Sequence, residues 1–241
     1  MAPSQKDLSE LPHFQEDHKL DRASLKDQAA EILRDHITAG RIPEGTRLTE
    51  RQVSQLLGIS RMPAREALMV LETEGLVERD ANGRHVIELS EERVRELHEV
   101  RWTLERLAAE RAAAHINERG RAVLRARLDD LEEAIVTGDP ALCTARDLAI
   151  HQAIWRQANN AYLFKLLNSL LGVIFVLAAR VKIYADADVE RLRSQHRELV
   201  DLVTSGDAEG AGQCVEDQLK GVLPHSLLTF HGPEHADRDH S

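Results

Sequence analysis

Aromatic side chains make up only 3% of the 241 residues, and the sequence has two cysteines, Cys143 and Cys214. An interior with few aromatics has to be filled by aliphatic side chains and alanine, which favours packed helices over a β-sandwich or a barrel. Two cysteines exclude a disulfide framework and fit a reducing cytosol. We therefore expect a mainly α-helical, cytoplasmic protein that is long enough to bury a core without bridges.

Long apolar runs are missing as well. The longest one, Leu170 to Ala179, has about half of the ~20 residues that a bilayer requires, and the N-terminus lacks a basic-then-apolar signal pattern. No membrane partner is therefore expected. The net charge of −10 argues against a protein that coats nucleic acid nonspecifically, but it leaves room for a local basic surface.

The rhythm of the sequence divides the chain into four parts. Residues 1–22 and 229–241 are polar, of mixed charge and without periodicity, which predicts flexible tails. From 23 to 89 the predicted elements are short and separated by turns, whereas from 90 to 228 only long helical patterns follow. We expect a small N-terminal domain followed by an all-α bundle of six or seven helices.

Residues 23–89 predict three helices followed by two strands. Thr49 caps the second helix with Gln52 at the capping-box position, and only Gly58-Ile59 separate that helix from a third, capped by Ser60. Asn82-Gly83 between two short runs is a strong hairpin signal. Two helices joined by so short a turn and followed by a hairpin form a winged helix-turn-helix.

The helix predicted from Ala161 to Tyr184 is apolar nearly all round. A helix without a polar face is either central in its bundle or packs against a partner chain.

A basic surface is predicted at the start of the third helix. From Arg51 to Arg65 there are three arginines and no acid, and Arg61 and Arg65 share one helix face because they are spaced i, i+4. Guanidinium groups match guanine O6 and N7 or two phosphate oxygens, and Ser60 offers a hydroxyl at a helix start, where phosphate is favoured. The wing tip Asn82-Gly83-Arg84 adds a close-approaching backbone and one cation. Singly, these arginines would indicate a solvated face; together with the short turn and the wing, they favour double-stranded DNA as the partner.

The stretch "LTERQVSQLLGISRMPAREALMVLETEGLV" resembles the winged-helix signature of GntR-family bacterial transcription factors, and the match covers about residues 25–88. The resemblance implies the following DNA contacts: Arg51, Ser60, Arg61, Met62, Arg65 and Gly83. Family members usually have Thr at the position of Met62. Because Met cannot donate a hydrogen bond, one contact is expected to differ, and operator preference with it.

A second constellation lies in the helical half. Asp147 and His151 are spaced i, i+4 and so point the same way, which makes half of a divalent-metal site, and His196 on a later helix is a candidate third ligand. The alternative is a surface Asp–His hydrogen bond and a packed histidine.

The helical half resembles the FadR-type C-terminal (FCD) effector domain of the GntR family over about residues 92–222. The matching pieces are "EVRWTLERLAAERAAAH", "DLAIHQAIWRQANNAYL" and "QHRELVDLVTSGDAEGA". In metal-binding members an Asp and three His hold the ion, so the resemblance implies Zn²⁺ or Ni²⁺ at Asp147, His151 and His196, with Gln218 in place of the fourth ligand. A glutamine oxygen binds such metals more weakly than imidazole does. Cys143 and Cys214 precede two of these positions by four residues, so each either approaches the site or is a small buried hydrophobe.

The resemblance also implies a small organic-acid effector. Arg101 matches a recurrent family arginine that would grip a carboxylate, with Glu105 one turn on. The alternative for Arg101 is an i, i+4 pair with Glu105 on the helix surface. Asn160 matches a family position too, although helix capping explains it equally well.

These observations predict a transcriptional regulator, a repressor, rather than an enzyme. A homodimer would place two recognition helices ~34 Å apart on a palindromic operator, and an effector would shift the population that binds DNA. Two alternatives stay open: the metal ion itself is the signal, or the chain is a metal-dependent hydrolase with a DNA-binding head. Against the hydrolase, the sequence has no HExxH motif and no nucleophile elbow.

Overall fold

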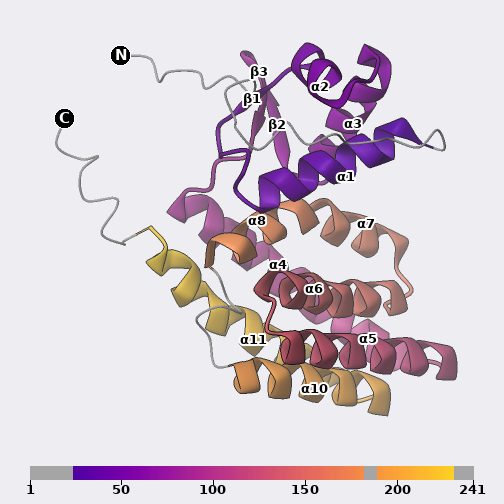
Figure 1. The fold of residues 1–241 in the computed structure, drawn as a ribbon. Coiled ribbons are helices and arrows are strands. Elements are labelled where there is room, and N and C mark those ends of the chain that lie inside the picture. Colours follow the sequence, from indigo (N-terminus) through magenta and orange to yellow (C-terminus); the bar gives the residue numbers. More distant parts are fainter. Residues whose placement is uncertain (1–23, 182–188, 231–241) are drawn as a thin grey trace. The chain divides into compact units, whose positions relative to one another are not determined.

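The computed structural model describes residues 24–181 and 189–230 (Figure 1). The tails predicted over 1–22 and 229–241 lie almost wholly outside the described residues. Contacts divide the chain into two compact units. Of the described residues, the first unit contains 24–89 together with Ser169–Leu177, and the second contains Ser90–Asn168 together with 178–181 and 189–230. The assignment of Ser169–Leu177 to the first unit was not expected from the sequence.

Three helices of the first unit follow local signals. They are α1 (Leu25–Thr38), α2 (Glu50–Leu57) and α3 (Arg61–Thr73). The predicted capping box is present, because the Thr49 side chain accepts from the Gln52 N–H and the Gln52 side chain accepts from the Thr49 N–H. Gly58 ends α2 in the left-handed conformation at φ 62°. Leu33, Leu68 and Leu71 are fully buried, so α1 and α3 share one core.

The wing is a three-stranded antiparallel sheet in the order β1-β3-β2. Its strands are β1 (Arg47–Leu48), β2 (Val77–Asp80) and β3 (Gly83–Val86). The predicted hairpin is β2–β3, with Asp80 opposite Gly83, where φ is 124°. Strand β1 was not predicted, because a strand of two residues is too short to show an alternating pattern.

The continuous helix predicted from 161 to 184 is wrong. The chain forms α7 (Ala161–Ser169) and α8 (Leu171–Val181), bent by 41° relative to one another. The break has a tertiary cause, since the Gly172 N–H donates to the Glu74 carbonyl oxygen at 3.0 Å. A Cβ at Gly172 would lie 2.3 Å from that oxygen, so only glycine fits. Within the described ranges no single helix is long and apolar enough to cross a membrane, and α7 and α8 reach that length and composition only as a bent pair.

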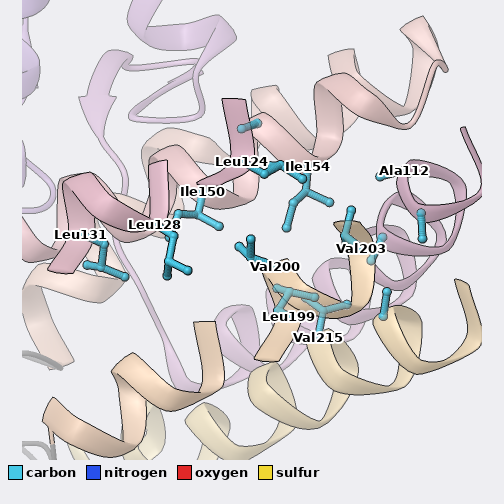
Figure 2. Close-up of a cluster of buried hydrophobic side chains, with 14 of the residues drawn as sticks. Ala112, Leu124, Leu128, Leu131, Ile150, Ile154, Leu199, Val200, Val203 and Val215 are labelled. Carbon is cyan, nitrogen blue, oxygen red and sulfur yellow. The ribbon is translucent and has the colours of Figure 1, made fainter. Parts of the chain in front are cut away.

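Over the described part of the chain, the second unit is built on five long helices besides α7 and the end of α8. They are α4 (Glu91–His115), α5 (Glu118–Thr137), α6 (Pro140–Gln157), α10 (Val189–Ser205) and α11 (Ala208–Leu228). Figure 2 shows leucine, isoleucine, valine and alanine side chains of these helices meeting in one core, with Leu124 and Leu131 from α5 and Leu199 from α10 fully buried. The mainly α-helical fold with an aliphatic core is therefore confirmed.

Candidate DNA interface and candidate metal centre

The residues predicted to contact DNA around the start of α3, which we call the reading residues, lie at the surface of the first unit. Arg61 is the first residue of α3, and Arg61, Met62 and Arg65 are exposed, Met62 to 63%. Ser60 is the N-cap with an extended backbone, but its side chain accepts no hydrogen bond from its own helix. The hydroxyl and the first N–H groups of α3 therefore remain available to an anion.

A cleft of about 380 Å³ joins the start of α3 to the wing. Five arginines line it: Arg47, Arg51, Arg61, Arg79 and Arg84. Gly83 and the single carboxylate Glu50 also line it. We call it the arginine cleft. Arg47 and Arg79 were not predicted from the sequence. The strand register could have indicated Arg79, because it lies opposite Arg84 in the predicted hairpin.

Arg84 differs from the other arginines of the cleft. Its side chain is only 12% exposed, and its Nε lies 2.5 Å from Glu72 Oε1 while its Nη1 lies 3.4 Å from Glu50 Oε1. Arg65 reaches Glu50 only at 3.9 Å and is 59% exposed. Of the predicted cations, Arg84 is thus the one already neutralised by carboxylates of the protein.

The predicted metal ligands come together in the second unit. His196 Nε2 of α10 lies 2.7 Å from Asp147 Oδ1 of α6, and His151 Nε2 lies 3.4 Å from the same oxygen. Ligand atoms of the three residues all lie within 4.8 Å of one another. Both histidines are buried, and Asp147 is nearly so. This arrangement excludes the alternative of a surface Asp–His pair.

Each imidazole is held from its far side. His151 Nδ1 lies 2.8 Å from Glu105 Oε2 of α4, and His196 Nδ1 donates to the Leu192 carbonyl oxygen at 2.7 Å. Because each Nδ1 faces an acceptor, each Nε2 is directed to Asp147 and is the atom that a metal would use. Two imidazoles and a carboxylate with such outer contacts form a donor set that fits Zn²⁺ or Ni²⁺.

The charges of this cluster are strongly coupled. Burial would raise the pKa of the Asp147 carboxyl, but the charge of His196 and hydrogen bonds from both imidazoles outweigh burial and hold that pKa well below its usual range. Burial lowers the pKa of His151, but the charge of Glu105 and the hydrogen bond to Asp147 outweigh burial and raise that pKa. The two carboxylates therefore favour the imidazolium form of His151, and a metal bound at Nε2 would have to displace the proton from that nitrogen.

Arg101 belongs to the same buried network. Its Nε donates to Glu105 Oε1 at 2.9 Å, and the two side chains are 8% and 1% exposed. Trp155 Nε1 donates to the other Glu105 oxygen at 3.3 Å. The i, i+4 pair considered in the sequence analysis thus exists, but in the interior rather than on the surface.

The remaining predicted residues have identifiable local partners. The Gln218 amide donates to the Gln195 carbonyl oxygen at 2.7 Å and to Cys214 Sγ at 3.2 Å. Asn160 Oδ1 accepts from the Leu163 N–H, which is the capping contact that explains Asn160 without an effector. Cys143 is buried in the core of the second unit, and Cys214 packs against that core.

Known proteins share both halves of the chain. Residues 25–87 match the gntR family of bacterial regulatory proteins, and residues 96–221, more than half of the chain, match the FCD domain. A "Probable D-xylose utilization operon transcriptional repressor" of Paenarthrobacter nicotinovorans is 28% identical over 207 residues, which cover 86% of this chain and 90% of that protein. The gluconate operon transcriptional repressor of Bacillus licheniformis is 30% identical over 196 residues, covering 79% of this chain and 80% of that protein. The solved structure of McbR/YncC of E. coli has the same fold, with a TM-score of 0.65 at 22% identity over 83% of this chain and 97% of that one. The protein described here is thus a member of the GntR family of bacterial regulatory proteins and carries an FCD domain in its second half.

Proposed function

We propose that this regulator is a cytoplasmic, homodimeric repressor whose binding to a palindromic operator is controlled by a small organic acid. The observation that carries the DNA-binding part is the start of α3, where Ser60 is uncommitted and Arg61 and Arg65 are exposed on one helix face. Such a helix end presents N–H groups and guanidinium forks to the edges of bases and to phosphates. Exposed Tyr162 and Leu166 on α7 support a dimer, since large apolar side chains at a surface favour burial against a second copy.

The second unit is the proposed sensor. Asp147, His151 and His196 would hold a Zn²⁺ or Ni²⁺ ion, which supplies an open coordination position for a carboxylate oxygen of the effector. Glu105 orients His151, and Leu192 orients His196. Gln218 would contribute its amide oxygen as a weak fourth ligand. The gluconate operon repressor among the relatives fits an effector of this chemical class.

Control is proposed to work by linkage. An effector that binds the DNA-competent and DNA-incompetent arrangements of the dimer with different affinity shifts the population between them. Couplings of ~1–3 kcal/mol would change operator occupancy about 5- to 150-fold.

The test combines two variants with one DNA and a panel of organic acids. Wild type, Arg61→Ala and His151→Ala are titrated against the inverted repeats upstream of the protein's own gene, with and without each acid. We expect Arg61→Ala to lose roughly 1–3 kcal/mol of operator binding. His151→Ala should keep the operator affinity of wild type but lose the response to acids. A wild-type protein that recognises none of these repeats, with or without acids, would contradict the proposal.

The metal ion as the signal is the second candidate. It is favoured by one observation, which is that Arg101 is already paired with Glu105 and so does not present a free guanidinium to a carboxylate. Operator binding that responds to added metal in the absence of any acid would favour this candidate. Two of the relatives are named as operon repressors, one of them as a probable one, which supports regulation rather than hydrolysis as the role of the cluster.

A further inference from the structure

The arginine cleft contains more positive charge than the reading residues account for. Besides Arg51 and Arg61, it is lined by Arg47 of β1 and Arg79 of β2, the two outer strands of the wing. Arg47 lies opposite His85 and Arg79 opposite Arg84 in the register of β3. Both side chains are exposed. The strands β1 and β2, which were not predicted to contact DNA, thus place two cations beside the reading residues at the start of α3.

These cations lack compensating charges. Among residues 24–181 and 189–230, no carboxylate forms an ion pair with Arg47, Arg51, Arg61 or Arg79. In the second unit, by contrast, Arg95 and Arg197 each pair with a glutamate. Gathering four unpaired guanidinium groups around one cleft is unfavourable unless an anion is shared between them. The local excess is notable because the whole chain carries a net charge of −10.

The wing backbone allows a polyanion to come close. Gly83 is at the tip of the hairpin, and a Cβ there would lie 3.4 Å from Nε of Arg47. The Arg47 guanidinium therefore lies beside the residue at which the backbone of the wing can approach a phosphate most closely. Arg84, the neighbouring cation, is turned toward Glu72 and Glu50 and holds the wing to α3 and α2.

We propose that Arg47 and Arg79 form a phosphate clamp that grips the sugar–phosphate backbone of duplex DNA next to the bases read from α3, while Arg84 is a positioning residue of the wing. The inference rests on the proposed DNA-binding function. It assigns the backbone contact of the wing to two residues in β1 and β2 in place of Arg84.

The clamp is tested without knowledge of the operator, because phosphate contacts do not depend on sequence. The probe is a fluorescein-labelled, mixed-sequence duplex of ~30 base pairs, about three helical turns, titrated by fluorescence anisotropy at several salt concentrations. The full-length variants are Arg47→Gln, Arg79→Gln and the double variant. Arg41→Gln is the matched control, because Arg41 is an exposed arginine of the first unit outside the cleft. Arg84→Gln tests the positioning role.

Each lost phosphate contact is expected to lower the slope of log affinity against log salt by ~0.9 and to weaken binding roughly eightfold at ~0.1 M salt. Arg47→Gln and Arg79→Gln should show this change with an unaltered melting temperature, and the double variant should show about twice the change in slope. Arg84→Gln should lower the melting temperature, because it leaves Glu72 without its partner.

Three results would overturn the clamp. The first is a double variant that binds with wild-type affinity and slope, while Arg61→Ala still loses operator binding. The second is an equal loss in Arg41→Gln, which would reduce the effect to net charge. The third is a wild-type protein that binds no duplex at low salt. Of the three results, only this one would also contradict the proposed DNA-binding function.

Discussion

The two units handle charge in opposite ways. In the first unit, the guanidinium groups around the start of α3 and the wing are exposed, except that of Arg84, and most have no carboxylate beside them. In the second unit, Glu105 and His151 are buried, and each lies beside two side chains of opposite charge: Glu105 beside Arg101 and His151, and His151 beside Glu105 and Asp147. Exposed, uncompensated charge suits a large polyanion that brings its own counter-charge. Buried, compensated charge suits a small site whose geometry is fixed in advance.

The largest expected effect comes from removing a buried carboxylate of the second unit. Glu105→Ala removes the carboxylate that pairs with both Arg101 and His151 and should lower the free energy of unfolding by about 3–5 kcal/mol, because it leaves the buried Arg101 charge uncompensated and His151 with Asp147 alone. Urea unfolding followed by circular dichroism measures the change. Glu91→Ala is the matched control, since Glu91 pairs with Arg95 at the same spacing on the same helix but at the surface, and it should cost below ~1 kcal/mol. Equal losses in the two variants would show that burial of the pair is not what matters.

Metal binding by the buried Asp147, His151 and His196 cluster has the second-largest expected effect. If Asp147, His151 and His196 hold a metal, Zn²⁺ at about a hundred times its dissociation constant should raise the free energy of unfolding by ~2.7 kcal/mol, and a chelator should remove that gain. His196→Gln should lose the response. Gln218→His should bind Zn²⁺ more tightly, because imidazole is the better ligand for this metal. Metal analysis and thermal unfolding with and without chelator provide the measurements, and purified protein far below one metal equivalent that also ignores added Zn²⁺ would refute the site.

The next prediction tests the exposed arginines of the first unit, Arg61 and Arg65. Arg61→Ala or Arg65→Ala should cost roughly 1–3 kcal/mol of specific operator binding if these residues read bases. The same variants should leave the free energy of unfolding within about 0.5 kcal/mol of wild type, because both side chains are exposed. A gel-shift titration and a urea curve on the same preparations separate the two quantities. Loss of stability in step with loss of binding would mean that these arginines are structural.

The smallest expected effect concerns Met62. Its side chain is 63% exposed at the start of α3, where the family usually has threonine. Met62→Thr restores a hydroxyl and should strengthen or redirect DNA binding by about 0.5–1.5 kcal/mol, the net contribution of one hydrogen bond. Competition between operator variants that differ at single base pairs would detect the redirected preference, and identical affinities for every variant would exclude a contact at this position.

Features set by neighbours in sequence could be predicted. The capping box of Thr49 and Gln52, the end of α2 at Gly58 and the hairpin at Asn82-Gly83 all depend on residues within a few positions of one another. The Asp147–His151 pair was equally accessible, because i, i+4 spacing fixes a shared helix face.

Features set across the fold could not be predicted. The break between α7 and α8 depends on a hydrogen bond from Gly172 to Glu74, far away in sequence. Glu105 meets His151 only because α4 packs on α6, and helical periodicity in α4 alone could not show which residue of α6 it faces. Arg47 reaches the wing through a strand of two residues, which carries no detectable pattern.

The grouping of Ser169–Leu177 with the first unit has a consequence for engineering. The tight fit of Gly172 against the Glu74 carbonyl ties a stretch of the later chain to the end of α3, so the winged module is discontinuous in the gene. A chimera that joins residues up to Leu89 to a foreign effector domain would lack Ser169–Leu177, and the end of α3 would lose its contact with Gly172. Exchange of the winged module between such regulators should therefore succeed only when Ser169–Leu177 is transferred together with it.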